Sequence, residues 1–132
     1  MTTARQKGAD FEQLACQFLT TQGLAVIATN YAVPKIGEID IIATHDVAQK
    51  STKTHPTLVF VEVKVRTMSQ FAQAVETVTL AKQRKLIKTA EHFLQTNENY
   101  ADFDCRFDVV AFQMDEWHRM SVDWRQGAFW VE

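Results

Sequence analysis

Cysteine is scarce in this sequence, and its scarcity excludes a disulfide-stapled fold. The 132 residues include two cysteines, Cys16 and Cys105, which form no CxxC motif. Small domains held together by disulfides carry far more cysteine, so we interpret both as reduced, partly buried thiols. The four histidines are scattered and show no spacing typical of a zinc site.

Long apolar runs are missing too. No run approaches the roughly 20 residues that a membrane-spanning helix needs, and residues 1–6 are polar, without an apolar signal segment. We therefore expect a cytoplasmic protein with no membrane partner. The sequence has no internal repeat, low-complexity tract or visible domain boundary. Residues 1–132 are accordingly predicted to form a single domain with its own core.

An excess of positive charge is also absent. The formal net charge is −2 and the sequence pI is about 6.1, so the chain as a whole lacks the electrostatic footprint of a nucleic-acid-binding protein. Basic residues crowd one short segment, residues 82–88. Such a run is usually a solvated helix face, and its functional alternative is contact with a phosphate backbone.

What the sequence does contain is a pair of charges inside an apolar run. Residues 58–65 are rich in valine and alternate as a strand does, so that successive side chains point to opposite faces. Glu62 and Lys64 then share a face with Leu58 and Phe60. Because burying charge is costly unless the charge is paired or binds a metal, this placement indicates a specific role.

A second alternating run, residues 37–44, lies upstream. Its acids Glu38 and Asp40 would share one face, and the other face would carry Ile39, Ile41 and Ala43. Antiparallel pairing of the two runs would bring Asp40 near Glu62 and Lys64. Two adjacent carboxylates repel each other, and a divalent cation with oxygen ligands relieves that repulsion. A lysine beside them can orient a water or stabilise negative charge on a phosphate.

The order of the remaining elements predicts an α/β fold with a central mixed sheet flanked by helices. Helices are expected over residues 4–22 and 75–96, and strands over residues 24–31, 37–44, 58–65 and 107–113, with a last strand within 117–130. The helix between the third and fourth strands favours a parallel pair joined by a crossover. Arg106 and Asp108 are expected to form a structural pair, and the three tryptophans to serve packing.

Glu12 has two interpretations. It lies at the edge of the apolar stripe of the first helix, and position alone favours a solvated flank residue. The alternative is a third carboxylate that leans over the strand pair.

A series of motifs runs through the chain in order: Gly8-x-x-x-Glu12-x-x-Ala15, Asn30-Tyr31, Gly37-Glu38-Ile39-Asp40, residues 60–66 (FVEVKVR), Lys82-Gln83-x-Lys85, residues 106–109 (RFDV) and Ala128-Phe129. This series resembles the YraN-like family of small bacterial proteins, described as endonuclease-like. Through that family the chain is similar to the PD-(D/E)XK nuclease superfamily and to archaeal Holliday junction resolvases. The resemblance implies a restriction-endonuclease-like core.

The resemblance also implies roles for individual residues. Glu12, Asp40 and Glu62 would be the acidic ligands of Mg²⁺ or Mn²⁺, with the backbone carbonyl of Val63 as a further ligand, and Lys64 would be the catalytic lysine. DNA would be the partner, and the analogy with the resolvases adds a homodimer. The residues expected to contact nucleic acid are Arg66, Lys82, Arg84 and Lys85.

Three functions remain open on the sequence. The leading one is a metal-dependent nuclease that hydrolyses DNA phosphodiester bonds, with branched or recombining DNA as the substrate the resemblance suggests. The acidic pI, together with the single modest basic cluster at residues 82–88, favours a non-catalytic nucleic-acid-binding or regulatory module on the same fold. The third is a protein-interaction adaptor, which would enclose the charges in a closed ionic network.

Overall fold

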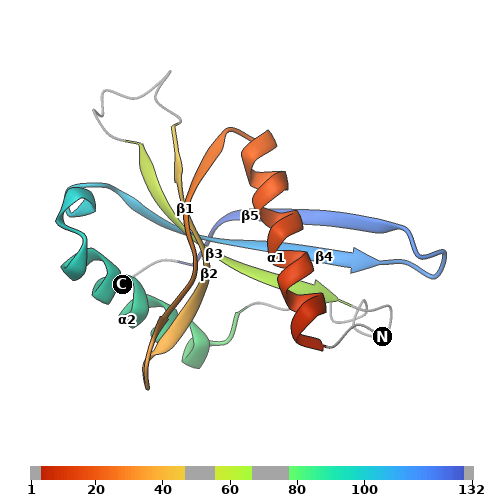
Figure 1. Cartoon of the computed structure of the whole chain (residues 1–132), viewed down its shortest axis with the longest axis horizontal. Coiled ribbons are helices and arrows are strands. Elements are labelled where there is room, and N and C mark those ends of the chain that lie inside the picture. Colours follow the sequence, from red (N-terminus) through yellow and green to blue (C-terminus); the bar gives the residue numbers. More distant parts are fainter. Residues whose placement is uncertain (1–3, 47–55, 67–77, 130–132) are drawn as a thin grey trace.

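The computed structural model describes residues 4–46, 56–66 and 78–129, and within them one helix, three strands, a second helix and two further strands follow one another along the chain (Figure 1). Two long helices lie on the two sides of the sheet, and a short 3₁₀ helix precedes the fourth strand. The elements are α1 (Ala4–Thr21), β1 (Leu24–Val33), β2 (Gly37–His45), β3 (Thr57–Arg66), α2 (Leu80–Thr96), η3 (Glu98–Tyr100), β4 (Cys105–Met114) and β5 (Met120–Phe129).

The five strands form one mixed sheet in the order β1-β2-β3-β4-β5. Neighbouring strands are antiparallel except β3 and β4, which are parallel and joined through α2. This confirms the predicted α/β class with a central mixed sheet and the parallel crossover. The arrangement is consistent with a restriction-endonuclease-like core. Among the described helices, none is long and apolar enough to cross a membrane.

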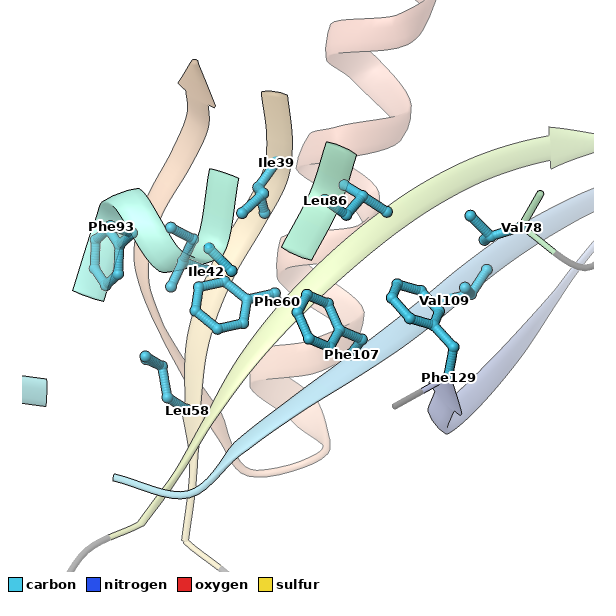
Figure 2. Packing of buried hydrophobic residues seen from close by; sticks show 11 residues of the cluster. Ile39, Ile42, Leu58, Phe60, Val78, Leu86, Phe93, Phe107, Val109 and Phe129 are labelled. Carbon is cyan, nitrogen blue, oxygen red and sulfur yellow. The ribbon is translucent and has the colours of Figure 1, made fainter. Parts of the chain in front are cut away.

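The sheet has an apolar cluster on each face. On the α1 face, Ala15 and Leu19 pack against alternate residues of the central strands, including Val59 and Val61. On the α2 face, Leu86 and Phe93 of the helix cover the other residues of the same strands (Figure 2). The α2-face cluster consists of Ile39, Ile42, Leu58, Phe60, Val78, Leu86, Ala90, Phe93, Phe107, Val109 and Phe129.

Gly37 lets β2 approach α2 closely. A Cβ built on Gly37 would lie 2.8 Å from Thr89 Oγ1 and 3.5 Å from the backbone oxygen of Lys85. Thr89 is fully buried and its hydroxyl donates to that same oxygen at 2.7 Å, so it has little freedom to move away. A larger residue at position 37 would therefore push the helix off the start of β2.

Two expectations need correction. Ile39 packs in the α2-face cluster, whereas Ile41 and Ala43 pack on the α1 face, so the three do not share a face. Pairing between β2 and β3 stops at Ile41, and the residues before it pair with β1 alone and follow its twist. The second helix begins at Leu80 and not at residue 75, because Thr79 caps it; residues 75–77 lie outside the described residues.

The tryptophans differ in their burial and packing. Trp124 is half-buried and packs edge-to-face on Phe18, with ring centroids 5.9 Å apart, as expected for a packing role. Trp117 lies in the turn between β4 and β5 and is 69% exposed, so the packing prediction is wrong there. Trp130 lies outside the described residues.

Candidate functional site

The end of the β2–β3 strand pair brings Asp40 and Glu62 close together. The ladder runs from His45–Thr57 to Ile41–Val61, and Asp40 and Glu62 are the next residues of the two strands beyond the last pair. At this step Asp40 Oδ2 accepts a hydrogen bond of 2.8 Å from the backbone N–H of Val63. The Asp40 carboxylate is therefore fixed against β3, as the antiparallel pairing of the two runs predicts.

The surroundings of Asp40 favour its protonated form. Burial and then the negative charge of Glu62 raise the pKa of Asp40 from 3.8 to about 7, and Glu12 acts in the same direction. The Val63 N–H and the Lys82 ammonium oppose them. The repulsion between the two carboxylates, expected from sequence, is thus present, and a further positive charge at this place would relieve it.

Helix α2 supplies one positive charge already. Lys82 Nζ lies 2.5 Å from Glu62 Oε1, and the side chains are 49% and 8% exposed respectively. The Thr79 hydroxyl accepts from the Lys82 backbone N–H at 3.2 Å, an N-cap that sets the position of the first turn. Lys82, expected to contact a phosphate backbone, is therefore engaged by the candidate catalytic glutamate in this structure.

The other predicted residues lie on α1, β3 and α2. Lys64 is half-buried and follows Glu62 on the same strand, and Glu12 is half-buried on α1. Glu12 contributes to the field at Asp40 from the opposite helix to Lys82, so the site lies between the two helical layers. Arg84 and Lys85 are exposed on α2, whereas Arg66 is only 4% exposed and lines a cavity.

The donors near Asp40 suit a hard divalent cation in part. Across residues 4–46, 56–66 and 78–129, no three His, Cys, Asp or Glu side chains gather closely enough to hold a metal ion. Two carboxylates and the Val63 carbonyl are nevertheless oxygen donors of the type that Mg²⁺ takes, and Mg²⁺ keeps several waters and needs only one or two carboxylates from a protein. The mutual repulsion of Asp40 and Glu62 is the observation that favours such an ion.

A second charged cluster was found only in part from sequence. Asp108 is buried and its carboxylate accepts from Arg106 Nε and Nη2 at 2.8 and 3.0 Å, which confirms the structural pair. It also accepts from the Trp124 indole at 2.9 Å and from the Gly127 N–H at 3.0 Å. Arg106 in turn contacts His45 Nδ1 at 3.0 Å, and burial followed by the Arg106 charge lowers the pKa of His45. These contacts join β4 to β5 and to the end of β2.

Comparison with known proteins places the chain among bacterial relatives. The family model described as uncharacterised protein family UPF0102 matches residues 11–112, a range that contains every candidate site residue from Glu12 to Lys85. A UPF0102 protein of Psychrobacter sp. (strain PRwf-1) is 41% identical over 130 residues, which are 95% of this chain and 88% of that protein.

Two further relatives carry the same family name. A UPF0102 protein of Psychrobacter arcticus is 45% identical over 113 residues, 85% of this chain, and the match spans 62% of the relative's length. A UPF0102 protein of Francisella tularensis subsp. novicida is 41% identical over 124 residues, 94% of each chain. The names of all three relatives give the family and no activity.

Proposed function

Since this chain belongs to the uncharacterised protein family UPF0102, the family to which the YraN-like resemblance pointed, we propose from its site that it is a metal-dependent nuclease hydrolysing DNA phosphodiester bonds. The observation that carries the proposal is the placement of Asp40 against Glu62 at the end of the β2–β3 ladder, with the pKa of Asp40 raised to about 7. A fold alone would not require this placement.

Asp40, Glu62 and the Val63 carbonyl are the groups that would hold Mg²⁺ or Mn²⁺. Such an ion supplies a water of lowered pKa and neutralises charge that develops on a phosphate. The carboxylates of Asp40 and Glu62 fix the position at which that positive charge is held. The Lys64 ammonium, two residues after Glu62 on the same face of β3, places a further charge where a scissile phosphate would gain negative charge. Glu12 adds negative charge from the α1 side.

Cleavage of labelled DNA tests the proposal. Linear, flapped and four-way-junction substrates are incubated with Mg²⁺, Mn²⁺ or EDTA, using the wild type, Asp40→Ala and Lys64→Ala. We expect cutting that needs a metal and that falls at least about 100-fold in either variant, because each removes a group that acts on the reacting phosphate. Asp102→Ala, which removes an exposed acid outside the site, is the matched control and should cut as the wild type does.

A second candidate rests on the Lys82–Glu62 contact. An ammonium that already neutralises Glu62 favours a nucleic-acid-binding module without turnover. In that case all substrates would stay uncut with every metal, and wild type and Asp40→Ala would bind DNA equally. Metal-dependent cutting lost in Asp40→Ala would exclude this candidate.

A further inference from the structure

A cavity of about 120 Å³ opens on the α2 face of the sheet, and nothing in the chemistry described above uses it. Its floor consists of Val109 and Ala111 of β4, and Phe129 of β5 closes one side. Val78 contributes from the segment before α2; Val78, Val109 and Phe129 belong to one cluster (Figure 2). The cavity thus borders the α2-face cluster.

The strand register places this cavity beside the candidate catalytic strand. Glu62 faces Val109, which in turn faces Arg125, and Lys64 faces Ala111. Side chains at facing positions share one side of a sheet, and neighbouring strands lie about 4.8 Å apart. The floor residues are therefore the immediate neighbours of the Glu62–Lys64 pair, one strand away.

The polar groups of the cavity are few: Arg66, only 4% exposed, lines it from β3, and Gln83, Asp123 and Arg125 supply the others. Arg125 Nε and Asp123 Oδ2 form a pair 3.1 Å long, with both side chains about half exposed. Gln83 of α2 also lines the cavity, and its Nε2 donates to the Val78 carbonyl at 2.7 Å. Guanidinium, carboxylate and amide side chains are the kinds that read the edges of nucleobases.

The size limits how much of a base can enter. A volume of about 120 Å³ is below that of a cavity that encloses benzene, about 150 Å³, so this cavity would hold part of a base and would not enclose the whole ring system. An apolar floor with an aromatic wall suits the face of a flat ring, because bases stack on aromatic side chains and arginine planes. A bare phosphate would find most of this wall apolar.

We propose that this cavity, called here the base pocket, takes part of one unstacked nucleobase of the DNA strand next to the phosphate held at Asp40, Glu62 and Lys64. This inference rests on the proposed nuclease function. It adds that the enzyme selects one base beside the cut. A base that is already unpaired enters at the lowest cost, because unstacking and unpairing consume free energy. The base pocket therefore favours substrates with unpaired or strained bases at the cut.

The first test reads base position without cleavage. 2-Aminopurine, whose fluorescence increases when it leaves a base stack, is placed at successive positions of an oligonucleotide on both sides of the flap junction. Each oligonucleotide is then bound to the Lys64→Ala protein. We expect brightening at one position only, lost in an additional Ala128→Leu substitution, which fills the base pocket from its exposed rim. Ala25→Leu, at an exposed alanine of the opposite edge strand β1, is the matched control and should keep the signal.

The second test uses cleavage. An abasic site at the position identified by fluorescence should lower kcat/KM of the wild type about 10-fold, the value of one stacked base, and should have no effect on cleavage by Ala128→Leu. Brightening that survives Ala128→Leu, or that occurs at no position, would overturn the base pocket even if cleavage is intact. Absence of cleavage would overturn the nuclease proposal alone, because the fluorescence result stands without turnover.

Discussion

Replacing Asp40 with asparagine gives the most direct test of the electrostatics of the site. Asparagine has the shape of aspartate, and its carbonyl oxygen can still accept the hydrogen bond from the Val63 N–H, observed at 2.8 Å. What the substitution removes is the negative charge, which burial and Glu62 disfavour. Asp40→Asn therefore isolates the cost of holding that charge in the folded protein.

The magnitude follows from the pKa. Asp40 has a pKa of about 7 in the fold against an ordinary value of 3.8, and this difference corresponds to about 4 kcal/mol. Below pH 3.8 the carboxyl is neutral in both folded and unfolded chains and costs nothing. Between pH 4 and about 7 the unfolded chain ionises first, so the stability of the wild type falls as the pH rises. Above pH 7 the full cost is present.

Urea unfolding monitored by tryptophan fluorescence measures this effect. At pH 8.5 we expect Asp40→Asn to be about 2–4 kcal/mol more stable than the wild type, and at pH 4.5 the two should agree within about 1 kcal/mol. Glu38→Gln, at an exposed acid of the same strand, is the matched control and should change stability little at either pH. An Asp40→Asn effect of equal size at both pH values would refute the reasoning.

Magnesium adds a second readout to the same experiment. If Asp40 and Glu62 hold the ion, Mg²⁺ at 100 times its Kd should stabilise the wild type at pH 8.5 by about 2.7 kcal/mol. Asp40→Asn should gain much less, because one of the two charges that attract the ion is missing. Equal stabilisation of both proteins would mean that Mg²⁺ binds at a site that does not include Asp40.

Three further changes test the contacts around the site, each by urea unfolding at pH 7. Lys82→Met should cost about 1–2 kcal/mol, between the values for surface and buried ion pairs, because buried Glu62 loses its ammonium partner; an unchanged stability would mean that the pair is not formed in solution. Gly37→Ala should cost about 1–3 kcal/mol by overpacking, since its Cβ would meet the Thr89 hydroxyl at 2.8 Å, and Thr89→Ala in the same chain should recover part of the loss. Asp108→Ala should cost about 3–5 kcal/mol, because it leaves a buried guanidinium without its carboxylate, and a cost under 1 kcal/mol would contradict the network.

The main outline of the fold was predictable from local patterns. Alternation in residues 58–65 placed Glu62 on the same face as Leu58 and Phe60, and a helix between the third and fourth strands predicted their parallel pairing. Antiparallel pairing of residues 37–44 with that strand predicted the approach of Asp40 to Glu62. These inferences hold because strand periodicity and chain connectivity act over short distances in the sequence.

Other features depend on where elements dock, which the sequence pattern does not contain. The Lys82–Glu62 contact requires the docking of α2 over β3, and a run of basic residues predicted a solvated or DNA-binding face instead. Ile39 changes face because the β2–β3 ladder ends beside it, a boundary that alternation cannot reveal. The full set of donors to Asp108 includes the distant Trp124 indole, whereas the sequence indicated only its near neighbour Arg106.

The β2–β3 ladder also separates two ends of the molecule that can be altered independently. Its pairs run from Ile41–Val61 to His45–Thr57, a span of about 13 Å at the rise of a β-strand. The candidate carboxylates lie beyond the first pair, and the connection from β2 to β3 leaves from the last. A fluorescent label attached at Thr57, in the last pair, would lie at the end of the ladder away from the candidate carboxylates. This geometry gives a way to follow single molecules of the protein without modifying the candidate site.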